Sequence, residues 1–413
     1  MDARSVRITG WGMYAPERVV TNKDLERVVD TSDDWIRSRT GIRERRFAAS
    51  HETTATLAAI AGKRAIAVAG LQPDDIDLIF VATLTPDYWM PSTGALVKEA
   101  IGNTRAAAMD VMAACSGFVY AYASADAYLR TGRYRHALVI GAEVLSRFLD
   151  FSDRNTCILF GDGAGAVVLS ASEELGGGMA GIEMTTDPDG AYMIWLPSGG
   201  SRSPSTDATV GRGEHYVRME GRETYRYATK TMASSALTAI DQAGWRPEEV
   251  DLFIPHQANV RIIESVAKGL GLPMDKMFVN VDRYGNTSAG SVGLALSEAV
   301  DSGRIAVGDK VVLVAFGAGL TSGAAAIEWT ADPLCGRRAE SVEPVASVRE
   351  PVDWSSVDPM TDRLRQVLGG GPPTPLDDVA PGEPEPARDD APELARDEVP
   401  AGREVARGRE VRA

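Results

Sequence analysis

The chain has 413 residues, of which 44% are hydrophobic, and its formal net charge is -15. This length allows two lobes of ordinary domain size, and the acidic balance argues against general nucleic-acid binding. Three cysteines without a regular spacing predict neither a disulfide framework nor a zinc site. Because the N-terminus lacks a signal-peptide pattern and no apolar run reaches roughly 18 residues, we expect a protein of the reducing cytoplasm.

Two segments of similar sequence predict the same local unit in each half of the chain. Residues 69–78 (AGLQPDDIDL) parallel residues 243–252 (AGWRPEEVDL). In each segment a glycine ends a helix, a proline turns the chain, and an apolar strand follows. The strands are expected over 79–82 and 253–255, so the chain is predicted to contain two similar α/β halves.

Cys115 lies in the segment DVMAACSGF, residues 110–118. A short apolar stretch precedes it, and residues 118–129, rich in Ala and Tyr, are expected to form a helix. The thiol is thereby placed at a strand-to-helix turn, where the helix dipole and free N–H groups favour the thiolate and lower the pKa. A buried, inert cysteine is the alternative interpretation of this residue taken alone.

A second repeat connects Cys115 with Asn286. Residues 110–133 parallel residues 281–304, with TGR and SGR as the final three residues of the two segments. This offset places Cys115 on Asn286. Two similar α/β halves imply layered sheets with helices between or outside them, related by a pseudo-twofold axis. A site at the junction would use Cys115 from one half and Asn286 from the other.

His256 is the third candidate, in the segment IPHQAN that directly follows the second predicted strand. Loops at strand ends are where α/β folds place functional groups. The other three histidines have no such context. Asn286, in YGNTSAG, has the common alternative role of a turn residue beside glycine, and its repeat equivalence to Cys115 argues against that role.

The composition changes after Trp329. Residues 331–413 contain 12 of the 22 prolines, 18 acidic residues, 11 Arg and a single aromatic residue, Trp354. Such a segment buries too little apolar surface to order itself, so we predict a largely disordered tail. A short helix over 355–368 is the exception that apolar spacing allows. The predicted divisions are 1–175, 176–330 and 331–413.

The motifs around Cys115, His256 and Asn286, in this order and spacing, resemble the β-ketoacyl-acyl carrier protein synthase III family of the thiolase superfamily. The resemblance spans roughly residues 4–329 and includes 30–45 (DTSDDWIRSRTGIRER) and 160–165 (FGDGAG). Asn286 is diagnostic, since elongating synthases that resemble this family use Cys-His-His. The resemblance implies a thiolase-like duplicated α/β fold with α-β-α-β-α layers. We interpret FGDGAG as close backbone packing near the site, because it lacks the spacing of a nucleotide-binding loop.

The resemblance also implies an activity, the decarboxylative Claisen condensation of an acyl-CoA primer with malonyl-acyl carrier protein. The product, a 3-oxoacyl-acyl carrier protein, initiates fatty acid synthesis. Cys115 would carry the acyl group, and His256 and Asn286 would stabilise the enolate. Backbone N–H groups of Cys115 and Ala318 would hold the oxyanion, although the family usually has glycine where Ala318 stands. Neither a metal nor a cofactor is expected.

Binding residues are likewise implied by the resemblance, together with a homodimer in which Met90 reaches the partner's acyl pocket. Arg222, Arg226 and Lys230 recur every four residues, which predicts a basic helix face. The acyl group itself is left open. The expected contacts are Trp35, Arg39 and Arg154 for CoA; Arg226, Arg261 and Lys268 for acyl carrier protein; and Met90, Leu145 and Phe160 for the acyl pocket.

Three alternatives stay open at this point. One is a starter ketosynthase or acyltransferase of a specialised, polyketide-type pathway. Another is a non-decarboxylative condensing enzyme. The hydroxymethylglutaryl-CoA synthase branch of such enzymes has a Glu base directly after a strand-end Gly-Thr. Here Leu84 follows Thr83, which argues against that branch. The third is a catalytically inactive scaffold, against which the intact Cys115, His256 and Asn286 argue.

Overall fold

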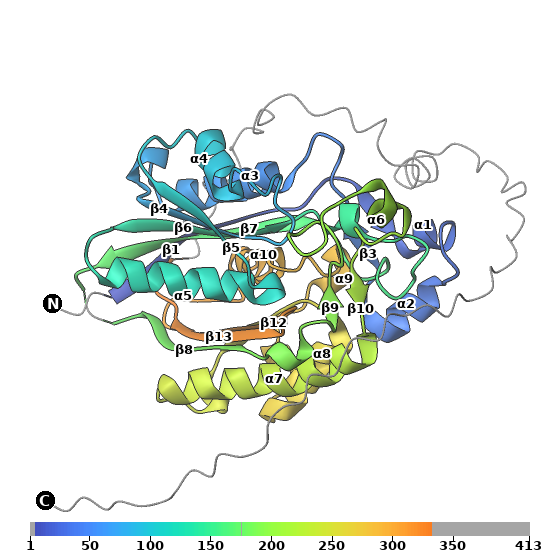
Figure 1. Ribbon diagram of the computed structural model, residues 1–413. Coiled ribbons are helices and arrows are strands. Elements are labelled where there is room, and N and C mark those ends of the chain that lie inside the picture. Colours follow the sequence, from blue (N-terminus) through green and yellow to red (C-terminus); the bar gives the residue numbers. More distant parts are fainter. Residues whose placement is uncertain (1–4, 175, 333–413) are drawn as a thin grey trace, which may run out of the picture. The chain divides into compact units, whose positions relative to one another are not determined.

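The computed structural model describes residues 5–174 and 176–332 (Figure 1). The predicted disorder of 331–413, apart from its first two residues, and the predicted helix over 355–368 lie outside the described residues. Within them, two sheets alternate with layers of helices.

The first sheet has the strand order β1-β7-β6-β4-β5. β7 pairs antiparallel with β1 and β6, whereas β4 pairs parallel with β6 and β5. The central strands are continuous apolar runs, as expected where helices cover both faces of a sheet. The five strands are β1 (Ser5–Tyr14), β4 (Leu78–Ala82), β5 (Ala107–Val111), β6 (His136–Glu143) and β7 (Gly163–Ser172).

The second sheet repeats this topology with the order β8-β13-β12-β11. Its first two pairings are antiparallel and the third is parallel. A single parallel bridge from Phe253 to Met277 stands where the first sheet has its fifth strand. The predicted duplication is therefore confirmed, with one strand reduced to a bridge. The four strands are β8 (Gly178–Thr186), β11 (Leu252–Pro255), β12 (Lys310–Gly317) and β13 (Thr321–Glu328).

Six helices complete the predicted α-β-α-β-α layers (Figure 1). One pair covers the outer face of each sheet, and the third pair lies between the sheets. None of the helices in the described ranges is long and apolar enough to cross a membrane. The outer pairs are α3 (Thr54–Val68) with α4 (Thr93–Ile101) and α7 (Gly221–Gln242) with α8 (Val260–Leu270); the inner pair is α5 (Gly117–Arg130) with α10 (Gly290–Asp301).

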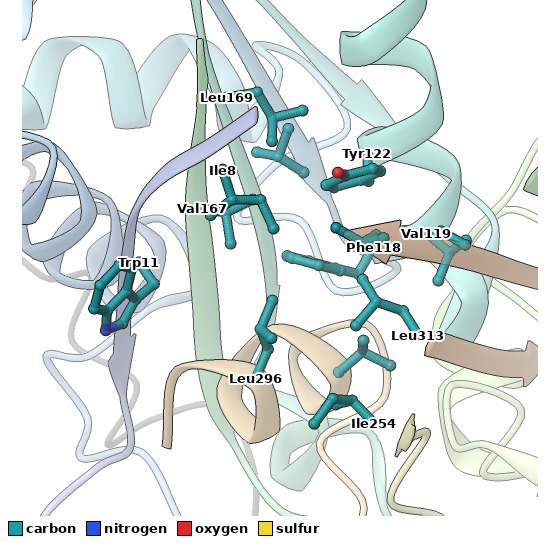
Figure 2. Close-up of a cluster of buried hydrophobic side chains, with 14 of the residues drawn as sticks. Ile8, Trp11, Phe118, Val119, Tyr122, Val167, Leu169, Ile254, Leu296 and Leu313 are labelled. Carbon is teal, nitrogen blue, oxygen red and sulfur yellow. The ribbon is translucent and has the colours of Figure 1, made fainter. Parts of the chain in front are cut away.

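Alternating side chains on the strands divide the core between these layers. In β4, Phe80 joins the central cluster, whereas Ile79 and Val81 join the cluster beneath α3 and α4. Figure 2 shows the central cluster, in which Phe118 of α5 and Leu296 of α10 lie between side chains of both sheets. The inner helices are consequently apolar around most of their circumference, and their N-termini lie within the protein.

Glycines allow α10 to approach the first sheet closely. A Cβ atom on Gly165 would overlap the backbone of Gly293 and Leu294, and one on Gly141 would overlap the backbone of Ala289. The interpretation of FGDGAG as close packing is thus confirmed. These contacts fix the start of α10 against the end of β6 and the start of β7.

Shorter elements gather beside the junction of the two halves. β2 pairs with β3 and β9 with β10, each as a small antiparallel ribbon. Their side chains contribute to a fourth apolar cluster that includes Leu145 and Phe160. The elements are β2 (Val19–Thr21), α1 (Asn22–Glu26), α2 (Asp33–Thr40), β3 (Glu44–Arg46), β9 (Ile194–Trp195), α6 (Asp207–Gly211), β10 (Arg218–Met219) and α9 (Val281–Tyr284).

Candidate active site

Cys115 lies in a 3-10 turn, Ala114–Ser116, between β5 and the buried N-terminus of α5. The preceding residue, Ala114, has φ 47°, in the region that favours glycine. The corresponding position in the second half is Gly285, φ 64°, directly before Asn286. Each half therefore makes a sharp turn before its candidate residue, and both residues lie at the junction of the inner helices.

The expected lowering of the Cys115 pKa is wrong. Burial raises the pKa of this thiol to about 12, and the negative charge of Glu143 acts in the same direction. A hydrogen bond with Ser288 opposes the shift without reversing it. Cys115 does precede a helix N-terminus, as predicted. Its surroundings exclude water from the sulfur, however, and loss of hydration disfavours the charged form.

His256 follows β11 and is fully buried. Its Nδ1 lies 2.6 Å from the Ser291 hydroxyl, which also accepts a hydrogen bond from the Gln257 N–H. Burial lowers the pKa of His256 to about 3, so the imidazole is neutral. Nε2 is buried without a hydrogen-bond partner among the described residues, and His256 lines the cavity beside Cys115.

Asn286 is held by backbone contacts with the neighbouring Leu159–Gly161 segment. Its N–H donates to the Leu159 carbonyl and its carbonyl accepts from the Gly161 N–H. The side-chain Oδ1 accepts a hydrogen bond of 2.8 Å from the Ser288 N–H. Because the oxygen is occupied in this way, the NH2 group is the part of the amide available to donate elsewhere.

Cys115, His256 and Asn286 line one cavity of about 560 Å³. Most of its wall is apolar and comes from segments far apart in the sequence. Leu145 and Phe160 line it as expected, whereas Met90 does not and is 87% exposed. Further lining residues that the sequence did not indicate are Trp89, Phe148, Ile194, Val217, Tyr225 and Phe316.

The loop after β12 lies against the Cys115 turn. A Cβ atom on Gly317 would stand 2.5 Å from the Cys115 nitrogen, and Thr321 donates a hydrogen bond of 2.9 Å to the Ala113 carbonyl. Ala318 lines the cavity, and its φ is not positive. Alanine is therefore tolerated at this point of the loop without strain in φ.

The residues expected to bind CoA are brought together on and near α2. The guanidinium carbons of Arg39 and Arg154 lie 5.6 and 5.2 Å from the Trp35 ring centroid. Trp35 packs against the apolar cluster that contains Leu145 and Phe160, although none of the three CoA residues lines the cavity itself. They form a cationic and aromatic surface next to the cavity wall.

The basic residues lie on α7 and α8, which pack together. Arg222, Arg226 and Lys230 are exposed on α7, which confirms the predicted basic face, and Arg261 and Lys268 are exposed on α8. The Arg261 guanidinium lies 5.9 Å from the ring of Tyr225, and Tyr225 lines the cavity. The basic surface thus borders the cavity.

Three polar residues of the site escaped sequence reasoning: Glu143, Ser288 and Ser291. Ser288 is part of the YGNTSAG motif. Glu143 is a carboxylate at the end of an apolar strand, and this position could have indicated a functional residue. Within residues 5–174 and 176–332, no group of three or more His, Cys, Asp or Glu residues could hold a metal ion.

The duplicated layered fold defines a thiolase-like α/β protein, with a thiol, an imidazole and an amide in one buried cavity. Residues 109–188 match the family model for 3-oxoacyl-[acyl-carrier-protein] synthase III, and 240–329 match the model for its C-terminal part. The chain is 51% identical over 329 residues to beta-ketoacyl-[acyl-carrier-protein] synthase III of Symbiobacterium thermophilum, covering 80% of this chain and 99% of that one.

Solved structures agree. The 3-oxoacyl-[acyl-carrier-protein] synthase III of Aquifex aeolicus is 43% identical with a TM-score of 0.73, covering 79% of this chain and 100% of that one. A priming beta-ketosynthase from a polyketide pathway is 34% identical with a TM-score of 0.74, over 80% and 98% of the two chains. The chain belongs to the beta-ketoacyl-[acyl-carrier-protein] synthase III family, and it is an acyltransferase.

Proposed function

We propose that this enzyme condenses an acyl-CoA primer with malonyl-acyl carrier protein, releasing carbon dioxide and forming the 3-oxoacyl-acyl carrier protein that initiates fatty acid synthesis. The observation that carries this proposal is the buried cavity shared by Cys115, His256 and Asn286, in a chain 51% identical to a synthase III. The polyketide alternative is less favoured, because the similarity to the priming ketosynthase is lower, at 34%.

In the first half-reaction, the Cys115 sulfur attacks the thioester carbonyl of the primer. An acyl-Cys115 thioester forms and CoA leaves as its thiol. The backbone N–H groups of Cys115 and Ala318 would hold the oxyanion of the tetrahedral intermediate. Support for this role comes from the approach of the Gly317–Gly319 loop to the Cys115 nitrogen.

In the second half-reaction, malonyl-acyl carrier protein loses carbon dioxide and the resulting carbanion attacks acyl-Cys115. Two neutral donors would stabilise the enolate oxygen, the Nε2–H of His256 and the NH2 group of Asn286. Ser291 favours this arrangement if its hydroxyl donates to Nδ1, because the imidazole proton then resides on Nε2. Since decarboxylation generates the carbanion, we infer that no cofactor is needed.

We assign the surface around Trp35, Arg39 and Arg154 to the CoA nucleotide. The Trp35 ring can stack on an adenine, and the Arg39 and Arg154 guanidinium groups beside it can bind phosphates. We assign Arg226, Arg261 and Lys268 to the docking of acidic acyl carrier protein. Their exposure beside the cavity supports this assignment in a protein whose net charge is -15.

We further propose a homodimer that forms along β5. This strand is the edge of the first sheet, and its backbone groups on one side are unpaired within the sheet. Beside it lie the exposed side chains of Trp89, Met90 and Met112, at 68%, 87% and 63%. A second copy would cover them and bring Met90 to the partner's acyl pocket, whose own wall includes Leu145 and Phe160.

We place the protein in the cytoplasm. The proposed nucleophile is a thiol that must stay reduced, and Cys115 and Cys157 are both free in the described chain.

The decisive experiment incubates the purified protein with acetyl-CoA and isobutyryl-CoA, with and without malonyl-acyl carrier protein. Intact-mass analysis should find one acyl group on Cys115, and release of carbon dioxide should accompany formation of the 3-oxoacyl carrier protein. The Cys115→Ala variant should take up no acyl group and should not condense. Acylation without carbon dioxide release would contradict the decarboxylative reaction, and condensation by Cys115→Ala would contradict the nucleophile.

A further inference from the structure

Glu143 ends β6 as a fully buried carboxylate, and its charge acts on the Cys115 thiol. No ion pair within the described ranges involves it. Its two oxygens instead accept hydrogen bonds from hydroxyl and backbone N–H groups on two loops. The donors are the hydroxyls of Thr83, Thr85 and Ser288 and the N–H groups of Leu84 and Thr85. A buried anion held without a cation is expensive, which suggests a use beyond packing.

The hydroxyl groups around Glu143 have defined directions. Thr85 Oγ1 accepts from the Val144 N–H and gives its hydrogen to Glu143 at 2.6 Å. Thr83 Oγ1 accepts from the Thr85 N–H and donates to Glu143 at 3.1 Å. Ser288 likewise donates to Oε1 at 3.1 Å. Because the single hydrogen of Ser288 is directed to Glu143, its oxygen is left as an acceptor toward the cavity.

Ser288 is the link between Glu143 and the nucleophile. Ser288 lines the cavity together with Cys115, and its hydroxyl lowers the pKa of the thiol by favouring the thiolate as a hydrogen-bond partner. Its φ of 47° lies in a region that a residue with a side chain seldom adopts, and its N–H is fixed on Asn286 Oδ1. The loop thus holds one hydroxyl between the reacting sulfur and a buried carboxylate.

We propose that Glu143 receives the Cys115 proton through the Ser288 hydroxyl during acylation, an inference that rests on the proposed function. The thiol hydrogen moves to Ser288 Oγ while the Ser288 hydrogen moves to Glu143 Oε1. The sulfur electrons form the new bond to the acyl carbon, and the bond from that carbon to the CoA sulfur breaks. The proton returns by the same route to the CoA sulfur. The products are acyl-Cys115 and CoA thiol, with Glu143 again a carboxylate.

The protonation equilibria agree with this route. Burial raises the pKa of Cys115 to about 12, so the thiol is protonated at neutral pH and needs a proton acceptor. Burial also raises the pKa of Glu143 to about 7, the range in which a general base is most effective. His256 is a poor acceptor, because its pKa is lowered to about 3.

Few titratable groups face Glu143. From the Cys115 turn it is faced by the thiol itself, and the loops at 83–85 and 288 present only hydroxyl and N–H groups. On β7, its partner Gly163 follows Asp162, whose pKa is raised to about 6 by burial. The Asp162 carboxylate is bound to Ala48 and Ser146 rather than to the Cys115 network.

The test measures single-turnover acylation of Cys115 by acetyl-CoA or isobutyryl-CoA, without malonyl-acyl carrier protein, by rapid quench and intact mass. The wild-type rate should rise with pH through an inflection at about 7 and then level off, because only the carboxylate accepts a proton. Glu143→Gln and Ser288→Ala should acylate about 100-fold more slowly and lose the inflection. If the Glu143→Gln variant keeps the inflection, the titrating group is another residue, such as Asp162, and the proposal is overturned.

Thr83→Val is the matched control, since it also removes a hydroxyl that donates to Glu143 at 3.1 Å. This hydroxyl is not linked to the sulfur, so the loss should stay below about tenfold and the inflection should persist. Equal losses in Thr83→Val and Ser288→Ala would overturn the proposal and leave Glu143 a structural anion. Glu143→Asp keeps a carboxylate and should retain the inflection, which provides a second variant should Glu143→Gln fail to fold.

A second readout separates acylation from condensation. Enzyme loaded with acetyl groups by prolonged incubation is mixed with malonyl-acyl carrier protein, and carbon dioxide release is followed over one turnover. Glu143→Gln should release it within about threefold of the wild-type rate, because the proton transfer belongs to the other half-reaction. A loss as large as that in acylation would overturn the assignment. If wild-type Cys115 takes no acyl group from either CoA ester, the proposed function fails, and the proton route fails with it.

Discussion

The His256 imidazole and the Cys115 thiol line the same cavity, and burial favours the uncharged form of each. For His256 this has a consequence for stability. Burial lowers its pKa to about 3 in the folded chain, whereas a solvated histidine has a pKa of 6.5. Above pH 6.5 neither the folded nor the unfolded chain binds this proton. As the pH falls from 6.5 toward about 3, the unfolded chain gains a proton that the folded chain does not.

We therefore expect the free energy of unfolding of the wild type to fall, relative to His256→Gln, by up to about 1.4 kcal/mol per pH unit below 6.5. Glutamine preserves a polar side chain near Ser291 but does not titrate. Urea unfolding of both proteins at several pH values from about 7.5 to about 5 measures the difference. A difference that does not change with pH would show that His256 is already protonated or solvated in the folded chain.

Asn286→Asp separates the two half-reactions. Aspartate keeps an acceptor for the Ser288 N–H but replaces the NH2 donor with a negative charge where enolate charge is proposed to develop. We expect decarboxylation of malonyl-acyl carrier protein to slow by about 100-fold or more. Acylation of Cys115, measured by mass, should fall much less. Equal losses in both steps would indicate that Asn286 maintains the shape of the cavity rather than binding the enolate.

The sequence repeat predicted correctly that Cys115 and Asn286 would meet, because equivalent positions in two similar halves lie around a common axis. The repeat could not predict properties that depend on which residues surround each side chain in the folded protein. The pKa of Cys115 follows from the exclusion of water, which motifs do not report. The contact between Ser288 and Glu143 spans 145 residues. The predicted role of Met90 requires a second copy of the chain.

At the scale of secondary-structure elements, the contact between β7 and α10 holds the two halves together. The Gly165 position admits no side chain, since a Cβ atom there would overlap the backbone of Gly293 and Leu294. Neither backbone can move without displacing α10, and Asn286 lies just before that helix. The helix expected over 118–129 is confirmed as α5, but the strand equivalent to β5 is reduced to a bridge at Met277, followed by α9.

We expect Gly165→Ala to destabilise the protein by about 3 kcal/mol or more, the upper range for an overpacked core. Gly211→Ala is the matched control, because Gly211 lies in α6 with nothing within 4 Å of its Cβ position. Alanine there should leave stability unchanged or raise it by up to about 1 kcal/mol. Urea unfolding midpoints compare the two variants with the wild type. Similar midpoints for both variants would contradict the close packing between β7 and α10.

At the scale of the whole molecule, the exposed side chains beside β5 predict self-association. We expect sedimentation velocity to find a dimer and Met90→Glu to shift it toward monomer, since a charge would lose its hydration in the interface. Val307→Glu is the control, because Val307 is also largely exposed, at 60%, but follows α10 instead of flanking β5. A wild-type monomer that condenses at full rate would contradict both the dimer and a pocket completed by Met90.

The catalytic unit should be complete without the segment that follows Asp332. The 329 residues aligned with the Symbiobacterium thermophilum synthase cover 99% of that protein, and every residue proposed for the site lies before Leu320. The Trp329 indole donates a hydrogen bond of 2.8 Å to the Ala331 carbonyl, and a cut after Asp332 preserves this contact. We expect the truncated enzyme to keep its Tm and to retain kcat/KM within about twofold. A large rise in KM for malonyl-acyl carrier protein at unchanged Tm would instead give residues 333–413 a part in carrier binding.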